Sequence, residues 1–396
     1  MKKILINIHY LETGGAESSL IGLLHALNPE MVAVDLMLDD RRGELMKYVP
    51  EWVNVLEIPE AYAMIERPII DVIRAGFIKI AAARVWAKIK YGLYRRKNKP
   101  EDGSAIFGYI GRYVTPLLPG LSYLGEYDAA VSYLTPHDIV LKKVKAKKKI
   151  CWIHTDYSSI DVDKMLELPV WDGYDKIVSI SDKVTETFVE VFPELKDKIA
   201  QIKPVLSESL IKGLSTAFVP DDMKKIGEEI NFLTIGRYCH AKNLESIPAM
   251  CRMICDKGID LKWYIIGYGA GDEYIREAID QNGMEKRVIL LGKKENPYPY
   301  IKSCDWYVQP SRYEGNCIAV KEAQILCKPV IITRYPTSGS QIEDGVDGMI
   351  VPMDASLAAN RISEIIGSNM SELISNNLGV SQLNINTDVE AFMSLL

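Results

Sequence analysis

Two segments in the second half of the chain carry charged residues at a spacing that suits a bound diphosphate. In the first, Gly236-Arg-Tyr-Cys-His-Ala-Lys-Asn243, an arginine and a lysine stand close together after an expected strand. Arg237 offers a guanidinium fork and Lys242 a point charge, at the entrance of an expected helix where backbone N–H groups are free. The segment therefore favours a phosphate site, although two solvated surface cations would give the same pattern.

Acidic residues stand in the second segment, Gln309-Pro-Ser-Arg-Tyr-Glu-Gly-Asn-Cys-Ile-Ala-Val-Lys-Glu322. Glu314 falls in a loop at an expected strand end, and Glu322 lies just over one turn into the next helix. A carboxylate in that place can accept a pair of ribose hydroxyls, and the N–H groups of residues 316–318 can face an anion or sugar oxygens. The alternative is that Glu322 pairs with a neighbouring lysine on a solvated helix face.

Glycines gather at two further strand ends. Ile265-Ile-Gly-Tyr-Gly-Ala-Gly271 can make a tight turn or let the backbone approach a ligand. Its Gly-x-Gly pattern would also fit a dinucleotide, but the acid that such a site needs about 20 residues later is not evident. Glu12-Thr-Gly-Gly-Ala-Glu17 joins the expected first strand and helix, where it suits contact with a phosphate or an acceptor, or forms a simple turn.

One histidine stands out in the first half. His154 ends an expected strand in Trp152-Ile-His-Thr-Asp156, facing the expected cleft, and Asp156 could orient it or simply belong to a turn. Taken alone, His154 could equally be a core or surface residue. The remaining histidines have no comparable setting: His9, His25, His137 and His240.

Expected strands and helices position these residues. Along the whole chain, apolar runs of strand length alternate with longer helical patterns. This alternation predicts an α/β fold of two doubly wound, Rossmann-like domains with a cleft between their strand ends. The weak stretch Pro204–Glu229 indicates the junction, so the expected domains are 1–205 and 206–385, with 386–396 a helix returning to the first. The expected strands are Ile4–Ile8, Val32–Leu38, Ala129–Tyr133, Ile150–His154, Ile177–Ile180, Asn231–Ile235, Leu261–Ile266, Val288–Leu291, Trp306–Gln309 and Val330–Thr333. The expected helices are Ser18–Leu27, Asn243–Cys255, Asp272–Gln281, Pro299–Ser303 and Ile318–Leu326.

Composition excludes several classes of protein. The 396 residues are 48% hydrophobic and 25% charged, which describes a folded protein of two domains rather than a disordered chain. A net charge of −6 argues against a general nucleic-acid binder. The seven cysteines lack the spacing of a zinc site, so we expect a reducing cytosol and no zinc site. The first residues read as a strand, not a signal peptide, and no apolar run is long enough to span a membrane.

The motifs Gly-Arg-x4-Lys, the glycine turn and Glu-Gly-x6-Glu, in this order, resemble retaining glycosyltransferase family four of the GT-B fold. The stretch Tyr307–Pro352 is similar to bacterial members that build surface polysaccharides. The resemblance implies that Arg237 and Lys242 hold the donor diphosphate, that Glu322 binds the nucleotide ribose, and that His154 contacts the donor sugar or its developing positive charge. It places further donor contacts on Gly14 and Gly15 (phosphate or sugar), Gly267 (the glycine turn), Gly292 and Lys293 (base), and Glu314, Asn316, Cys317 and Ile318 (sugar hydroxyls).

Residues 66–99 form a basic amphipathic stretch of ten basic and two acidic residues. We expect it to lie on the anionic inner leaflet and present a lipid-linked acceptor, or else to be a solvated basic helix over the core.

The expected function is transfer of a sugar, with retention and without a metal or cofactor, from a nucleotide sugar, for which UDP is our choice, to a glycan or lipid-linked acceptor. The expected location is the cytoplasm, at the inner face of the membrane if the basic stretch binds there. Two alternatives remain: a nucleotide-sugar 2-epimerase of the same fold, and a non-catalytic sugar-nucleotide-binding subunit. The donor sugar, the acceptor and the oligomeric state are not specified by the sequence.

Overall fold

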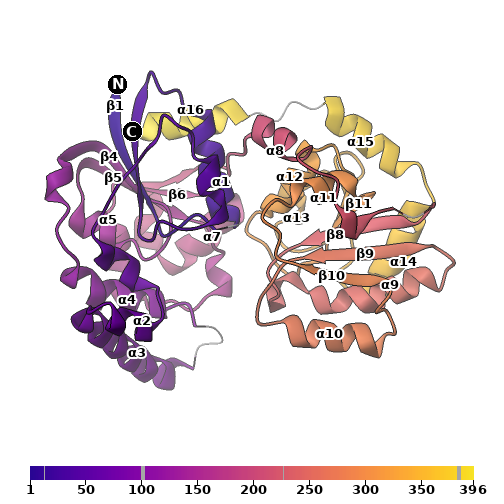
Figure 1. The fold of residues 1–396 in the computed structure, drawn as a ribbon, viewed down its shortest axis with the longest axis horizontal. Helices are drawn as coiled ribbons and strands as arrows, with labels where there is room; N and C mark the ends of the chain where they lie inside the picture. The colour runs from indigo at the N-terminus through magenta and orange to yellow at the C-terminus, as the bar shows by residue number, and fades with distance from the viewer. Residues whose placement is uncertain (13, 100–102, 226, 381–384) are drawn as a thin grey trace. The chain divides into compact units, whose positions relative to one another are not determined.

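The computed structural model describes residues 1–12, 14–99, 103–225, 227–380 and 385–396. They form two compact units: unit 1, Met1–Leu206 with Asn384–Leu396, and unit 2, Ser207–Leu383. Each unit is a parallel β-sheet covered by helices (Figure 1). The prediction of two doubly wound α/β domains is therefore confirmed.

The sheet of unit 1 has seven strands in the order β3-β2-β1-β4-β5-β6-β7. The strands are β1 (Lys2–Ile8), β2 (Val32–Leu38), β3 (Asn54–Val55), β4 (Glu126–Ser132), β5 (Lys145–Ile153), β6 (Lys176–Ser179) and β7 (Ile199–Gln201). The helices are α1 (Gly15–Ala26), α2 (Ile69–Arg74), α3 (Ile78–Asn98), α4 (Ile106–Val114), α5 (Asp138–Lys143), α6 (Lys164–Asp172), α7 (Asp182–Val191) and α16 (Ile385–Leu395).

Strand β1 lies in the interior of this sheet, where its apolar run is buried on both faces, as parallel strands require. It pairs with β2 on one side and β4 on the other, with Ile4 opposite both Val34 and Ala129. The strand order reverses between β1 and β4. Ligands of open α/β sheets bind at the carboxyl ends of the strands where the order reverses, so the loops after β1 and β4 are the candidate ligand loops of unit 1.

The sheet of unit 2 has six strands in the order β10-β9-β8-β11-β12-β13, and its order reverses between β8 and β11. The strands are β8 (Ile230–Ile235), β9 (Leu261–Ile266), β10 (Val288–Gly292), β11 (Trp306–Gln309), β12 (Val330–Thr333) and β13 (Met349–Val351). The helices are α8 (Glu208–Leu214), α9 (Ile247–Cys255), α10 (Asp272–Gln281), α11 (Tyr298–Ser303), α12 (Ile318–Ile325), α13 (Ser338–Gln341), α14 (Ala355–Ile366) and α15 (Met370–Val380).

Helix α9 shows how the sequence packs this unit. Its buried side chains include Ile247, Met250, Cys251 and Ile254, spaced three and four residues apart so that they form one apolar stripe. The stripe belongs to a hydrophobic core that also contains Trp263 of β9. A rigid sheet with its loops fixed at the strand ends is what positions the side chains described below.

The C-terminal helix α16 packs on unit 1. Phe392 is fully buried there, with its ring centroid 5.6 Å from that of Trp152. The backbone N–H of Lys203 donates to Asp388 at 2.9 Å. The last helix therefore completes the hydrophobic core of unit 1.

The prediction of a helix over Asn243–Cys255 was wrong at its start. Asn243 has a left-handed backbone (φ 55°), which ends one 3₁₀ turn, and a second turn follows before α9 begins at Ile247. Pro248 suits the first turn of α9, because a proline there loses no hydrogen bond. Arg237 and Lys242 thus lie in a loop and a 3₁₀ turn, not at the entrance of an α-helix.

Candidate functional site

The loops after β8 and β11 are tied together at the point where the strand order reverses. Lys242 Nζ donates to Glu314 Oε1 at 2.6 Å. The backbone N–H of Arg312 donates to the carbonyl oxygen of Ala241 at 2.8 Å, and its guanidinium pairs with Glu245 at 2.8 Å. The tertiary structure thus brings together the two segments that the sequence singled out. Arg312 was not predicted, since nothing in its spacing distinguishes it from a surface arginine.

The ion pair between Lys242 and Glu314 is largely shielded, with side chains 19% and 10% exposed. Burial alone would lower the pKa of Lys242, but the charge and hydrogen bond of Glu314 outweigh it and raise the pKa above its usual value. The lysine therefore stays cationic. Arg237 is exposed, and no carboxylate in the described residues pairs with it, so its guanidinium is available to an anion.

The glycine turn after β9 packs directly against the loop that carries Arg237. The backbone N–H of Tyr238 donates to the carbonyl oxygen of Tyr268 at 2.9 Å. A Cβ atom on Gly267 would fall 1.9 Å from the carbonyl oxygen of Gly236. Gly267 is therefore a glycine because two backbones meet there, and this packing fixes the position of the Arg237 loop.

The expected base contacts lie in the neighbouring loop. The carbonyl oxygen of Gly292, a residue with φ 69°, accepts a hydrogen bond from the N–H of Gly267 at 3.0 Å. Lys293 places its Nζ 5.1 Å from the ring centroid of Tyr268, which is 44% exposed. The three loops after β8, β9 and β10 thus form one continuous surface at the carboxyl edge of the sheet.

Glu322 is buried in α12 and accepts a hydrogen bond from the hydroxyl of Tyr298 at 2.8 Å. Burial raises the pKa of Glu322 to about 7, although the hydrogen bond from Tyr298 lowers it. The alternative of an ion pair with a neighbouring lysine was wrong. Lys321 and Lys328 instead donate to main-chain carbonyl oxygens, at 3.2 and 2.9 Å.

The three expected sugar contacts at the start of α12, at residues 316–318, differ in whether they are free to bind a ligand. The N–H of Cys317 donates to the side chain of Gln341 at 3.2 Å, and the same amide donates back to the carbonyl oxygen of Cys317 at 2.6 Å. The Cys317 N–H is therefore engaged within the fold, contrary to expectation. Ile318 begins the helix, and the side-chain oxygen of Asn316 is buried without a partner in the part of the chain described.

In unit 1, the paired glycines lie at the N-terminus of α1. Gly14 precedes the helix and Gly15 is its first residue. The Glu17 carboxylate lies so close to Gly14 that a Cβ atom there would fall 2.2 Å from its Oε2. The Glu17 carboxylate thus lies at the positive end of the helix dipole, beside the loop for which a phosphate or sugar contact is predicted.

His154 follows β5 and its ring lies 4.8 Å from the ring of Tyr133, whose hydroxyl is 3.1 Å from that of Ser19 on α1. Burial lowers the pKa of His154 to about 3, so the ring is neutral at physiological pH. Its Nε2 is buried and has no hydrogen-bond partner among the residues described. Asp156 does not orient the ring, because its carboxylate caps the following turn through the N–H of Ser158 at 2.9 Å.

His9 and His137 were not predicted as site residues, but both are buried in unit 1. His9 Nδ1 lies 2.8 Å from Asp39 Oδ2, and its Nε2 lies 2.7 Å from the carbonyl oxygen of Thr135, so it joins the ends of β1, β2 and β4. Burial lowers the pKa of His9, but Asp39 and Glu66 outweigh this effect and raise it to about 9. Burial lowers the pKa of His137 to about 3. A histidine directly after the central strand was the available signal for His9, but its partner was not visible in the sequence.

The chain contains one Asp-x-Asp tripeptide, Asp161-Val162-Asp163, a pattern that can bind a divalent cation. Asp161 and Asp163 accept hydrogen bonds from different tyrosines, Tyr94 at 3.0 Å and Tyr109 at 2.6 Å. Across the described residues, no three histidine, cysteine, aspartate or glutamate side chains are grouped so as to hold a metal ion.

Comparison with known proteins shows what the part of the chain that carries this site resembles. The glycosyl transferases of group 1 match residues 218–377, which contain every residue of the unit 2 site. The N-acetylgalactosamine-N,N'-diacetylbacillosaminyl-diphospho-undecaprenol 4-alpha-N-acetylgalactosaminyltransferase of Campylobacter jejuni is 28% identical over 89% of this chain and 87% of its own length. An uncharacterized glycosyltransferase of Methanocaldococcus jannaschii is 26% identical over 59% of this chain, which spans 60% of that relative's length.

A solved structure supports the fold. HepE of Anabaena, determined in complex with UDP and glucose, aligns with a TM-score of 0.68 and 14% identity over 100% of this chain and 99% of its own. The family match and the paired Rossmann-like units agree with each other and with the motifs. Residues 218–377 thus match the group 1 glycosyltransferases, and the chain has the GT-B fold.

Proposed function

We propose that this protein is a retaining glycosyltransferase that moves a sugar from a nucleotide sugar, with UDP as the expected nucleotide, to a glycan or lipid-linked acceptor in bacterial surface polysaccharide synthesis. It uses no metal and no cofactor beyond its donor. The carrying observation is the shielded Lys242–Glu314 pair at the switch point of unit 2, beside the unpaired Arg237. The name of the C. jejuni relative describes a sugar transfer onto an undecaprenol-linked acceptor, which supports this class of acceptor.

The chemistry breaks the bond between the anomeric carbon and the donor phosphate. Negative charge then develops on the leaving diphosphate, and Lys242 and Arg237 stabilise it electrostatically. The acceptor oxygen bonds to the anomeric carbon on the same face, and its proton passes to the leaving phosphate. Glu314 holds the transferred sugar, and the neutral ring of His154 accepts or donates a hydrogen bond at the sugar without adding a charge. Retention follows from the family resemblance.

Thermal unfolding with a panel of nucleotide sugars tests the proposal. We expect a UDP sugar at 100 times its Kd to stabilise the protein by about 2.7 kcal/mol, equally with and without EDTA. The same donor should release UDP slowly to water and faster with an acceptor. Absence of stabilisation by every nucleotide sugar contradicts the proposed function. A C2 epimer as product would favour the epimerase. Binding of the donor without its cleavage would favour the non-catalytic subunit.

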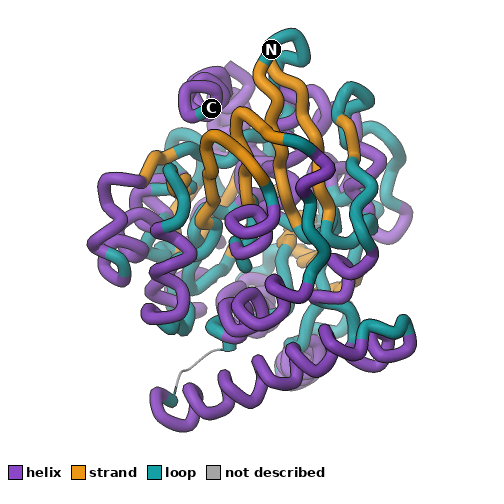
Figure 2. Tube along the Cα trace, turned by 90° about the vertical axis from the view of Figure 1, so that its left-hand side faces the viewer, coloured by secondary structure: helices purple, strands orange, loops and turns teal. Residues whose placement is uncertain are grey.

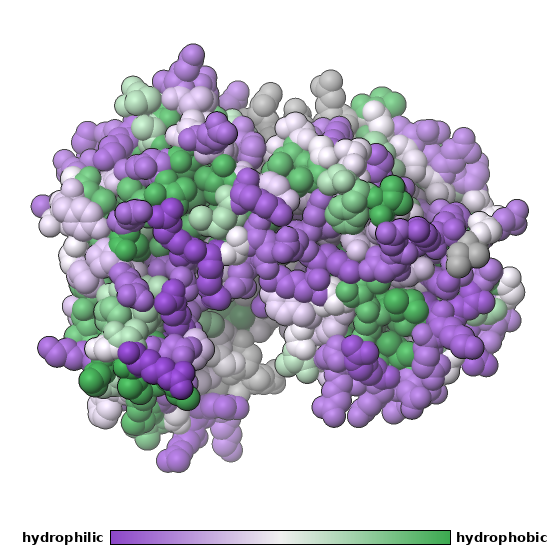
Figure 3. All heavy atoms as spheres, in the orientation of Figure 1, coloured by the Kyte–Doolittle hydropathy of each residue, from purple (hydrophilic) through white to green (hydrophobic). Residues whose placement is uncertain are grey.

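We further propose that unit 1 meets an anionic membrane through α3. The helix exposes an apolar stripe of Ile78, Val85, Ile89 and Leu93, with Trp86 beside it, each 44–67% exposed. Its opposite side, which includes Ile80, Arg84 and Ala87, is buried in unit 1. Figure 2 shows α3 as the long helix at the bottom, along the surface of unit 1, and in Figure 3 green and purple atoms adjoin where α2 and α3 lie.

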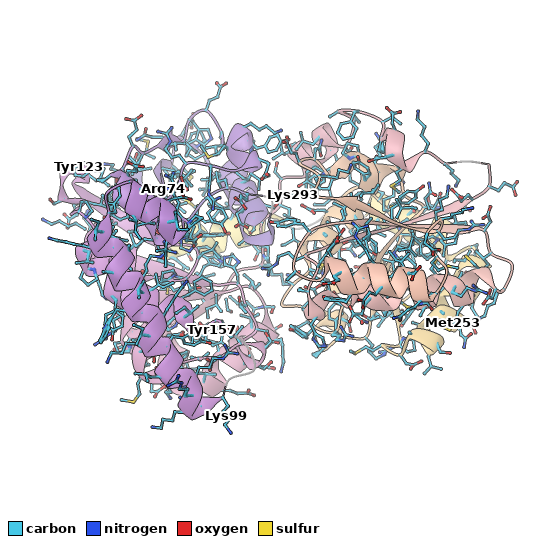
Figure 4. All side chains as sticks on the ribbon, turned by 60° about the horizontal axis from the view of Figure 1, so that its bottom comes forward. Arg74, Lys99, Tyr123, Tyr157, Met253 and Lys293 are labelled. Atoms are coloured by element: carbon cyan, nitrogen blue, oxygen red, sulfur yellow. The ribbon has the colours of Figure 1, made fainter. Side chains whose placement is uncertain are left out.

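The positive charge around this stripe indicates that the stripe contacts a lipid surface. Helix α3 has no acidic residue. Figure 4 shows it between the short helix carrying Arg74 and the labelled Lys99. The basic residues around the stripe are Lys79, Lys88, Lys90, Arg95, Arg96, Lys97 and Lys99. An apolar stripe flanked by cations is typical of a helix lying in an anionic interface. Among the helices described, none has the length and apolar character needed to cross a membrane.

Vesicle flotation measures this contact. We expect the protein to float with phosphatidylglycerol vesicles at low salt and less with phosphatidylcholine alone. Val85→Asp with Ile89→Asp should reduce the bound fraction about tenfold, because two acids enter the apolar stripe. Leu357→Asp is the matched control, since Leu357 is 56% exposed on α14 of unit 2. Equal flotation of all three proteins, or none by the wild type, would refute the membrane contact.

A further inference from the structure

The carboxylate of Glu322 is held by a phenol instead of a cation. Of the side chains described, the one that donates to it is Tyr298, at 2.8 Å from Oε1. We infer that Tyr298 is a positioning residue for the donor nucleotide, holding one oxygen of Glu322 so that the other faces the ribose hydroxyls. The inference rests on the proposed function, because it requires Glu322 to bind the ribose of the donor, as the family resemblance implies.

Tyr298 is itself fixed in place by its surroundings. It is the first residue of α11 and is 9% exposed. The side chain of Asn296 accepts the N–H of Tyr298 at 3.2 Å and donates to the carbonyl oxygen of Leu214 in α8 at 3.0 Å. Helix α8 contacts both α11 and α12. The phenol and the carboxylate therefore belong to two helices packed on a common third helix, which sets the geometry of their hydrogen bond.

The chain leading into Tyr298 is the loop that carries the expected base contacts. Only a few residues separate Gly292 and Lys293 from α11. A single short loop thus links the base-contacting backbone to the hydroxyl that holds the ribose acid. Through this connection Tyr298 joins the expected base contacts to the expected ribose contact of one nucleoside site. A tyrosine with a purely structural role would not do so.

Protonation provides a readout for this contact. Burial raises the pKa of Glu322 to about 7, and the hydrogen bond from Tyr298 works against that rise. Among the residues described, Tyr307 on β11 and Cys317 before α12 also face Glu322, and burial raises the pKa of both. Both are neutral near pH 7. Ribose hydroxyls donate best to an ionised carboxylate, so nucleotide affinity should increase as the pH rises through 7.

Calorimetric titration with UDP from pH 6 to 9 tests the inference on the full-length protein. For Tyr298→Phe we expect an affinity about tenfold below wild type at pH 7, with the pH midpoint of binding moved upward, because the carboxylate loses the donor that favoured its ionised form. The loss should shrink towards pH 9. Titration of the UDP phosphate affects every variant equally and cancels in the comparison.

Two variants serve as controls. Tyr300→Phe removes a hydroxyl from the same helix, but that hydroxyl lies by Lys294 and Asp222, so its pH profile should match wild type. Glu322→Gln should bind weakly and lose the pH step near 7. A Tyr298→Phe profile that superimposes on wild type overturns the positioning role while leaving the proposed function intact. Failure of wild type to bind UDP or GDP at any pH instead removes the proposed function itself.

Discussion

Replacing Lys242 with methionine is expected to lower sugar transfer by about 10²–10³-fold, the effect of removing one charge-stabilising donor from an active site. The lysine is the shielded cation that we propose to stabilise the leaving diphosphate, and methionine keeps much of its length without the charge. Glu314 would then lose its cation while 10% exposed, so stability should fall by about 1–3 kcal/mol. Initial rates of UDP release and urea unfolding measure the two effects separately.

Lys262 offers a matched control on the same unit. Its ion pair with Glu229 is similarly shielded, with side chains 21% and 8% exposed, but it lies in β9 away from the candidate site. Arg287 also lies 3.8 Å from the Glu229 carboxylate, so Lys262→Met should reduce stability by no more than Lys242→Met does, with transfer retained. The double variant Lys242→Met with Glu314→Gln should recover stability without recovering activity. Transfer at the wild-type rate by Lys242→Met would show that the diphosphate binds elsewhere.

Gly267→Ala should impair both folding and donor binding. The new Cβ would fall 1.9 Å from the carbonyl oxygen of Gly236 and 2.8 Å from the ring of Tyr238. Since the nearest atom belongs to the backbone, the loop carrying Arg237 must move, at a cost of about 1–3 kcal/mol. We expect UDP affinity to fall at least about tenfold, because the displaced guanidinium no longer meets the phosphates.

A second glycine makes this experiment specific. A Cβ on Gly339, in the short helix α13, would meet nothing within 4 Å. Gly339→Ala should leave UDP affinity unchanged and stabilise the protein by up to about 1 kcal/mol. Calorimetry with UDP and thermal unfolding distinguish the two variants. If Gly267→Ala bound UDP as tightly as Gly339→Ala, the packing of the two loops would not position Arg237.

Periodicity alone was sufficient for the central strands and several helices. The bounds expected for Val32–Leu38, Leu261–Ile266 and Asp272–Gln281 are those that the structure shows. Strands buried on both faces require unbroken apolar runs, and an amphipathic helix requires its own repeat, so both leave a local signal. Edge strands of two or three residues, such as β3 and β13, are too short to show a period and were not predicted.

The start of α9 shows where local patterns mislead. The apolar repeat suggested a helix from Asn243, but that residue adopts a left-handed backbone and its side chain donates to the carbonyl oxygen of Pro310 at 3.1 Å. Pro310 follows β11, far away in the sequence. A contact with another loop therefore set the helix boundary, and no reading of the segment itself could have supplied it.

The residue types of the site were in the sequence, but their partners were not. Spacing was sufficient to propose Arg237, Lys242, Glu314 and Glu322 as binding residues, because a diphosphate and a ribose need cations and carboxylates at strand ends. The pairing of Lys242 with Glu314 depends on a sheet that brings the ends of β8 and β11 together. Local spacing therefore predicted which side chains could bind a ligand. Only the tertiary structure decided which of them meet, because a hydrogen bond forms between groups that the fold places in contact, however far apart they are in the sequence.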